Sequence, residues 1–269
     1  MIPTPYHELN EVLDELVSRL VDRIGNKLIG VYLQGSFALG DFDEHSDADL
    51  IVVLENELSS DEVESLQFMH SKVYHLSPEW AKHLEGSYFP LNVLQGIERC
   101  DEELWYLDNG ARSLIRSDHC NTLLVRWIVR ESGVILTGPS PKELIGPIPT
   151  EMLRQEMYDV LMMWGQQILE DPAPWSNRFY QGFIVLNYAR MLHDLHRGYP
   201  GTKREGAEWA KRNLESSWSP LIDRAWSGRP DPASKVKEPA DPEEYQMTLE
   251  FLEHVMSECK RFMENRSCA

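Results

Sequence analysis

LIGVYLQGSFALGDFDEHSDADLIVVLE, residues 28–55, contains two apolar runs that bracket a polar loop. The first run, 28–33, leads into Gly35-Ser36, and the second, 50–54, follows Ser46-Asp47-Ala48-Asp49. Short apolar runs bounded by glycine, serine and aspartate are typical of strands. The segment therefore predicts two strands joined by a loop that carries glycine, serine and carboxylate side chains.

The two aspartates at the start of the second run predict a metal site. Residues two apart on a strand project to the same face, so Asp47 and Asp49 would place their carboxylates side by side, with Ala48 directed to the packed face. Two negative charges at such a short distance repel each other. A hard cation such as Mg²⁺, held by oxygen ligands and by substrate phosphates, would offset this repulsion.

The glycine and serine of the loop suit a phosphate group. Gly35 lets the backbone approach a ligand closely, and Ser36 offers a hydroxyl. A helix beginning at Phe37 would add unpaired amides, which attract anions. Metal and phosphate would then meet at this loop.

A third carboxylate is expected on a neighbouring strand, in the segment 83–89. The segment alternates between two sets of residues: one is Leu84, Gly86 and Tyr88, and the other is Glu85, Ser87 and Phe89. On a strand the two sets face opposite sides, so Glu85 would face the same side of the sheet as the aspartates. A carboxylate in that place can take the proton from a hydroxyl that attacks a nucleotide α-phosphorus, which makes Glu85 the candidate general base.

These motifs resemble the signature of the DNA polymerase β-type nucleotidyltransferases: Gly35-Ser36, a nine-residue gap, then Ser46-Asp47-x-Asp49. More narrowly, the chain resembles the aminoglycoside adenylyltransferases that inactivate streptomycin and spectinomycin. Residues 128–139 are similar to the segment that closes the first domain of that family, and residues 188–210 are similar to its helical domain.

The resemblance implies transfer of AMP from ATP to a hydroxyl of a small aminoglycoside-like acceptor bound between two domains, with release of pyrophosphate. It implies Mg²⁺ as the metal and Glu85 as the residue that deprotonates the acceptor. The metal and catalytic residues would be Asp47, Asp49 and Glu85, and the nucleotide-binding residues Gly35, Ser36, Ser46, Lys203 and Trp226.

The acceptor stays open at this stage. Leu169 and Pro174 stand where the streptomycin-modifying relatives carry a tryptophan and an aspartate, which leaves spectinomycin-like and unrelated hydroxyl acceptors. Ammonium groups of an aminocyclitol need acidic partners once they are desolvated, and Asp171, Glu205 and Glu208 are the candidates. Two alternatives are the same chemistry on a protein or another small metabolite, and a non-catalytic nucleotide-binding module.

The remaining pattern predicts an α+β protein with a nucleotidyltransferase domain at 1–149 and an all-helical bundle at 150–269, divided at a proline- and glycine-rich stretch, 138–149. In the first domain, helices at 5–24, 59–73 and 119–131 would pack on one face of a mixed sheet, whereas residues 100–118 show no clear pattern. The second domain would contain helices at 151–169, 179–195, 202–214, 220–226 and 242–263, with a loop at 229–242.

Charge and composition narrow the function further. The 44 acidic and 26 basic residues give a net charge of −18, which repels nucleic acid and argues against a polymerase or a tRNA-modifying enzyme. The alternative interpretation is that this acidity only aids solubility. No apolar run approaches the roughly 20 residues of a membrane span, and the start of the chain does not resemble a secretory signal. We therefore expect a cytoplasmic monomer with reduced cysteines, in contact with neither membrane nor nucleic acid.

Overall fold

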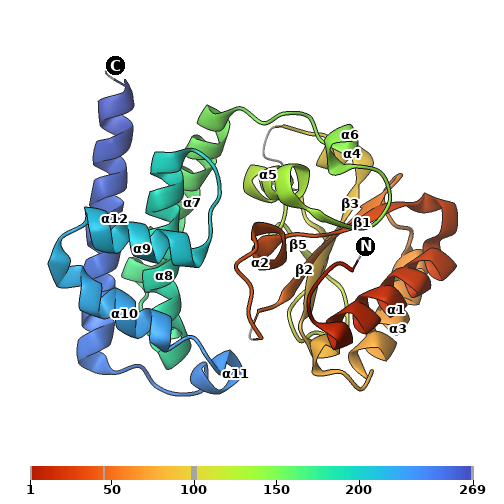
Figure 1. The fold of residues 1–269 in the computed structure, drawn as a ribbon, viewed down its shortest axis with the longest axis horizontal. Helices are drawn as coiled ribbons and strands as arrows, with labels where there is room; N and C mark the ends of the chain where they lie inside the picture. Colours follow the sequence, from red (N-terminus) through yellow and green to blue (C-terminus); the bar gives the residue numbers. More distant parts are fainter. Residues whose placement is uncertain (1, 45, 98–101, 268–269) are drawn as a thin grey trace. The chain divides into compact units, whose positions relative to one another are not determined.

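The computed structural model describes residues 2–44, 46–97 and 102–267 of the chain (Figure 1). The chain divides into two compact units between Ile148 and Pro149, one residue before the predicted division. The first unit contains the helices α1 (His7–Ile24), α2 (Gly35–Leu39), α3 (Ser60–Tyr74), α4 (Leu91–Leu94), α5 (Leu123–Ser132) and α6 (Pro141–Leu144). Its strands are β1 (Leu28–Leu33), β2 (Ala48–Leu54), β3 (Leu84–Pro90), β4 (Leu104–Leu107), β5 (Ile115–Ser117) and β6 (Val134–Thr137).

The strands form one mixed sheet in the order β5-β4-β3-β2-β1-β6. Strands β2 and β3 are parallel, and every other neighbouring pair is antiparallel. The mixed sheet confirms the predicted α+β class. Strands β4 and β5 lie within the stretch whose sequence pattern was not clear.

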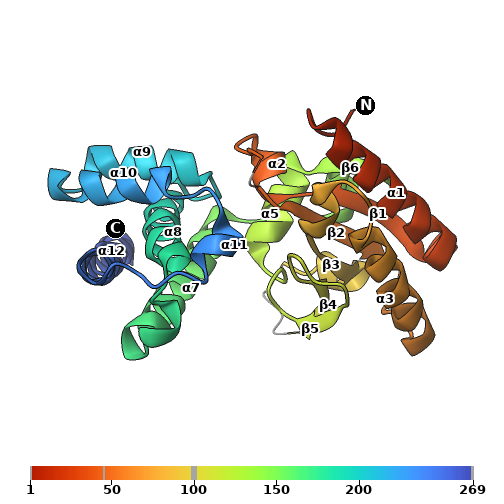
Figure 2. The same ribbon diagram turned by 90° about the horizontal axis from the view of Figure 1, so that it is seen from below.

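One face of the sheet packs against α1 and α3, which lie side by side (Figure 2). Helix α1 presents its apolar stripe of Leu9, Leu13, Leu16 and Leu20 to this face, and all four side chains are buried. Burial of these leucines contributes on the order of 2 kcal/mol each, which is why an amphipathic helix settles on this sheet. The helices and the strand residues on this face together enclose a hydrophobic core.

Helix α5 covers the other face of the sheet, so the expectation that helices pack on one face only was wrong. Its Arg126 is fully buried, and the guanidinium lies 5.5 Å from the ring centre of Phe89 on β3. The same guanidinium donates to the carbonyls of Val93 and Leu94 in α4 and to the side chain of Asn121. In the sequence Arg126 resembled an ordinary charged helix residue, and only the tertiary hydrogen bonds explain its burial.

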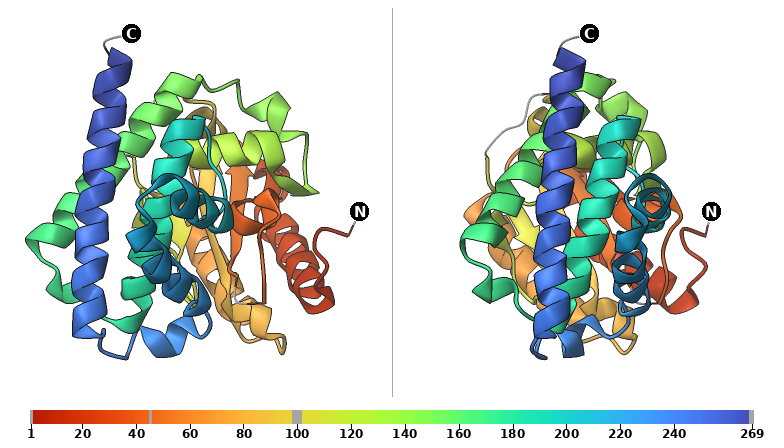
Figure 3. Two further views of the ribbon diagram at one scale, coloured as in Figure 1. Left: turned by 60° about the vertical axis from the view of Figure 1, so that its left-hand side comes forward. Right: turned by 90° about the vertical axis from the view of Figure 1, so that its left-hand side faces the viewer.

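The second unit is a helical bundle, as predicted, and α12 runs along α7 and α8 (Figure 3). Its helices are α7 (Thr150–Glu170), α8 (Arg178–Arg197), α9 (Lys203–Asn213), α10 (Ser219–Ser227), α11 (Pro232–Lys235) and α12 (Pro242–Ser267). Helix α11 corrects the expectation of a plain loop at 229–242. Short 3₁₀ turns occur at Gly25–Lys27, Glu79–Lys82, Ala173–Trp175 and Ser216–Trp218.

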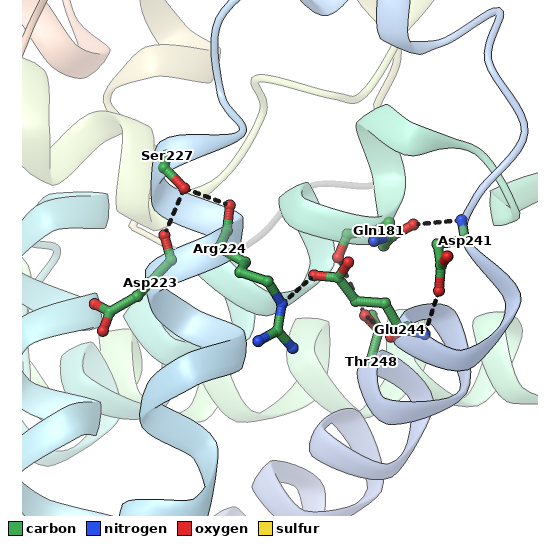
Figure 4. A network of polar contacts seen from close by, with 7 residues as sticks. All are labelled: Gln181, Asp223, Arg224, Ser227, Asp241, Glu244 and Thr248. Atoms are coloured by element: carbon green, nitrogen blue, oxygen red, sulfur yellow. Dashed lines mark hydrogen bonds and ion pairs between the residues drawn. The ribbon is translucent and has the colours of Figure 1, made fainter.

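Polar contacts tie α8, α10 and the start of α12 together (Figure 4). The side-chain oxygen of Gln181 accepts a hydrogen bond from the Asp241 amide at 2.9 Å. The backbone carbonyl of Gln181 accepts one from the Thr248 hydroxyl at 3.3 Å. Arg224 on α10 donates to Glu244 on α12 at 3.0 Å, and Asp241 accepts from the Glu244 amide. The α12 N-terminus is therefore capped and anchored to two neighbouring helices.

None of the helices in the described ranges combines the length and the apolar composition that a membrane span requires. Cys120 and Cys259 are buried free thiols, and Cys100 and Cys268 lie outside the described residues.

Candidate active site

Parallel pairing of β2 with β3 places Asp49 directly opposite Glu85. Their neighbours Ala48 and Leu84, also paired, are buried in the core beneath α1 and α3. Because side chains alternate along a strand, the two carboxylates lie together on the other face, as the alternation in the sequence predicted. The sheet itself thus places the two acidic residues side by side on neighbouring strands.

Gly35 lies against the carboxylate of Asp49. Its backbone has φ +61°, and a Cβ added to it would meet Asp49 Oδ2 at 2.0 Å. The amide of the preceding Gln34 donates to the Asp49 carbonyl at 2.9 Å. Helix α2 begins at Gly35, two residues before the predicted start, so the turn that enters this helix packs on Asp49. Only glycine satisfies both the left-handed backbone and this close approach.

Asp47 immediately precedes β2 and is more exposed, with 39% of its side chain accessible. Asn109 Nδ2 donates to Asp47 Oδ1 at 2.7 Å, and His83 Nδ1 is 3.9 Å from the same oxygen. The Ser46 hydroxyl accepts from the Asp43 amide at 2.9 Å and donates to the Asp43 carboxylate at 3.3 Å. In this structure Ser46 stabilises the chain segment that leads into Asp47.

Glu85 is half-buried, with 15% of its side chain accessible. The Tyr106 hydroxyl donates to Glu85 Oε1 at 2.7 Å, and His119 Nε2 is 3.6 Å from the same oxygen. Burial raises the pKa of Glu85, and the charges of Asp47 and Asp108 act in the same direction, against the Tyr106 hydrogen bond and His119. A carboxylate with a raised pKa holds a proton more readily, which suits a general base.

The three carboxylates have the donor chemistry that Mg²⁺ requires, since all their ligand atoms would be hard oxygens. The negative charge of Asp47 acts to raise the pKa of Glu85. Within the described ranges, no three His, Cys, Asp or Glu side chains already converge as a metal site. The three carboxylates therefore suit Mg²⁺ by their chemistry. In this structure Asp47 accepts a hydrogen bond from Asn109 and Glu85 accepts one from Tyr106.

Three of the residues that contact the carboxylates were not predicted: Tyr106, Asn109 and His119. Tyr106 belongs to β4, whose short run LWYL is a weak strand signal. Its contact with Glu85 depends on the pairing of β3 with β4, which one strand's sequence does not encode. Asn109 and His119 carry no local signal of this kind.

The predicted nucleotide-binding residues of the second unit have aromatic and cationic neighbours. Lys203 begins α9, and its Nζ lies 5.0 Å from the ring centre of Phe183. The guanidiniums of Arg204 and Arg229 lie 4.9 and 4.0 Å from the ring centre of Trp226. The roles of Lys203 and Trp226 stay predictions.

The acidic candidates for acceptor binding differ in their surroundings. Glu205 completes the capping box of α9 with Thr202 and also pairs with Arg197 at 3.0 Å. Glu208 pairs with Lys211 at 3.2 Å. Asp171 is exposed at the end of α7. Among the three, Glu205 thus has an evident structural role.

Comparison with known proteins assigns both units. Residues 11–88 match a nucleotidyltransferase domain, and residues 143–256 match the aminoglycoside adenylyltransferase C-terminal domain. The chain is 24% identical over 239 residues to an aminoglycoside (3'')(9) adenylyltransferase of Shigella flexneri, covering 80% of this chain and 83% of the relative. Its identity to the Klebsiella pneumoniae protein of that name is 24% over 234 residues, or 78% and 81% of the two chains.

A solved structure shares the fold. The spectinomycin adenyltransferase of Enterococcus faecalis, crystallised with ATP and spectinomycin, aligns with a TM-score of 0.65 over 93% of this chain and 98% of its own, at 14% identity. The two domain matches, the full-length relatives and the shared two-domain fold agree with one another. The chain therefore belongs to the aminoglycoside adenylyltransferase family and is a nucleotidyltransferase enzyme.

Proposed function

We propose that this enzyme transfers AMP from ATP to a hydroxyl of an aminoglycoside or aminocyclitol antibiotic of the spectinomycin or streptomycin type, and releases pyrophosphate. The observation that carries the proposal is the pairing of Asp49 with Glu85 across β2 and β3, with Gly35 packed against Asp49. This arrangement puts a candidate metal ligand beside a candidate base, next to a turn that a phosphate can approach.

Glu85 acts on the acceptor in this proposal. Its carboxylate takes the proton of the attacking hydroxyl, whose oxygen forms a bond to the α-phosphorus of ATP. The bond from that phosphorus to the bridging oxygen breaks, and pyrophosphate leaves with the electron pair. The partial burial of Glu85 favours this step because the raised pKa strengthens the base.

Asp47 and Asp49 would hold Mg²⁺, while Glu85 acts on the acceptor. When bound, the ion would supply positive charge that offsets the negative charge developing as pyrophosphate leaves. Ser36 and Ser46 are the proposed hydroxyl contacts to the phosphates, although the Ser46 hydroxyl bonds to Asp43 in this structure. Lys203 is the proposed positive charge for the triphosphate and Trp226 the proposed aromatic contact of the nucleotide.

The activity can be tested by incubating the purified protein with Mg²⁺, ATP and a panel of acceptors that includes spectinomycin and streptomycin. We expect pyrophosphate release with one of these antibiotics and a product heavier by one AMP group. Cells that express the chain should become less susceptible to the same antibiotic, and cells that express Asp47→Asn should not.

The same assay separates the alternatives. AMP transfer to a protein in cell extract, with no reaction on any antibiotic, would show that the chemistry is correct and the acceptor is not. ATP binding with no pyrophosphate release from any acceptor would contradict the enzymatic proposal and favour a nucleotide-binding module.

A further inference from the structure

The carboxylate of Glu85 is held by a residue of the neighbouring strand. The Tyr106 hydroxyl donates to Glu85 Oε1 at 2.7 Å and lies 3.2 Å from an oxygen of Asp108. His119 Nε2 is 3.6 Å from that same Oε1 atom of Glu85. Both of these contacts, made by residues that the structure describes, are to Oε1, so Oε2 is the atom that we assign to the acceptor hydroxyl.

Packing keeps the Tyr106 ring in place. Its side chain is buried, and β4 pairs with β3 so that Tyr106 lies opposite Ser87, two residues beyond Glu85 on the same face. The His119 ring is 5.5 Å from the Tyr106 ring. A buried aromatic ring has few accessible rotamers, so its hydroxyl is a fixed donor rather than a mobile one.

We propose that Tyr106 is a positioning residue for nucleotidyl transfer: its hydroxyl fixes the rotamer of Glu85 so that Oε2 faces the acceptor. The inference rests on the proposed role of Glu85 as the base. Tyr106 does not touch the reacting atoms and takes no proton. It acts by keeping Glu85 within hydrogen-bond reach of the acceptor hydroxyl, a condition that general-base catalysis demands.

The test compares Tyr106→Phe with Tyr88→Phe. Tyr88 lies on β3 but faces the core beneath α1 and α3, where its hydroxyl is 2.6 Å from His70 Nε2. Each variant removes one hydroxyl from a buried tyrosine: Tyr106→Phe loses the hydrogen bonds to Glu85 and Asp108, and Tyr88→Phe loses the one with His70. Only Tyr106→Phe alters a contact of Glu85.

With the acceptor that the panel identifies, Tyr106→Phe should lower kcat roughly 10- to 100-fold, because a hydrogen bond to a charged group is lost. The KM for ATP should stay within about twofold of the original protein. Tyr88→Phe should keep its kcat while losing a similar amount of thermal stability. A kcat for Tyr106→Phe within twofold of that of Tyr88→Phe would overturn the proposal.

A crystal structure of each variant provides a readout that does not depend on activity. We expect the Glu85 carboxylate to rotate or to occupy several rotamers in Tyr106→Phe and to stay in place in Tyr88→Phe. An unchanged Glu85 in both variants would refute the positioning role even if the original protein proved inactive on every acceptor. Inactivity of the original protein with a displaced Glu85 in Tyr106→Phe would instead refute only the proposed function.

Discussion

Gly35 leaves room for the carboxylate of Asp49, because a glycine has no side chain. Asp49 needs space on the face of the sheet that carries Glu85, and the turn into α2 passes directly over it. A side chain at position 35 would occupy the volume of the Asp49 carboxylate. The glycine therefore keeps the carboxylate where the paired strand places it.

Gly35→Ala should abolish most of the activity. The new Cβ would meet Asp49 Oδ2 at 2.0 Å and must displace it. A shift of about 1 Å at a reacting centre typically costs about 100-fold in rate. Steady-state pyrophosphate release measures this effect, and we expect kcat to fall by at least that factor.

Gly40→Ala is the matched control, because Gly40 ends the same helix with φ +74° and an added Cβ there meets nothing within 4 Å. Both alanine variants should lose about 1–2 kcal/mol of stability, the cost of a left-handed conformation. Only Gly35→Ala should lose activity. Equal activity in the two variants would show that Gly35 does not protect Asp49.

His70 makes the stability of the protein depend on pH. The ring is buried, with Nε2 at 2.6 Å from the Tyr88 hydroxyl, and burial lowers its pKa to about 4. Between pH 4 and the ordinary value of 6.5 the unfolded chain binds a proton that the folded chain does not, so stability falls as the pH falls. The contribution is complete above pH 6.5 and is lost as the pH approaches 4.

Urea unfolding at pH 7 and pH 5 measures this dependence. We expect the original protein to lose up to about 2 kcal/mol more than His70→Gln over this range, since a shift of one pKa unit corresponds to about 1.4 kcal/mol. Glutamine retains a polar group beside Tyr88 but does not titrate. An identical loss in both proteins would mean that His70 is already protonated, or accessible, in the folded state.

At the scale of the element, β3 serves two purposes with its two faces. Tyr88 is part of the core beneath α1 and α3, whereas Glu85 lies on the face of the site. Helices α1 and α3 pack on the face that includes Tyr88, so the stability of these helices supports the strand that carries Glu85 on its opposite face. A change that weakens α3 should thus affect folding without altering the chemistry.

Ser59→Ala tests this separation. Ser59 caps α3: its side chain accepts from the Glu62 amide, and the Glu62 carboxylate accepts from the Ser59 amide. Loss of such a cap costs about 1 kcal/mol of stability. Thermal unfolding should show this loss, and kcat should not change.

Ser60→Ala is the neighbouring control, because Ser60 occupies the first helical position of α3 and the capping side chain is that of Ser59. We expect almost no loss of stability in this variant. A kcat that falls with the cap would indicate that α3 is coupled to the site more directly than the fold suggests.

At the scale of the whole molecule, short-range patterns predicted more of the structure than long-range contacts did. The shared face of Asp49 and Glu85 followed from alternation along two strands, and the helices of the second unit followed from apolar spacing. The contact of Tyr106 with Glu85 depends on which strand pairs with β3. The burial of Arg126 depends on carbonyls supplied by α4, about 30 residues earlier in the chain.

The net charge of −18 belongs to the whole molecule as well. It repels phosphate backbones and attracts cations, a group that includes the proposed aminocyclitol acceptors with their ammonium groups.

The central claim is that Glu85 is the base of a nucleotidyl transfer on the face of β2 and β3. The most direct test measures ATP binding by calorimetry and pyrophosphate release for Glu85→Gln, with Glu64→Gln, an exposed glutamate of α3, as control. We predict that Glu85→Gln binds ATP within about threefold of the original protein but turns over about 100- to 10,000-fold more slowly, the usual contribution of a general base, while Glu64→Gln matches the original in both. Turnover by Glu85→Gln at a rate close to that of Glu64→Gln would contradict the account.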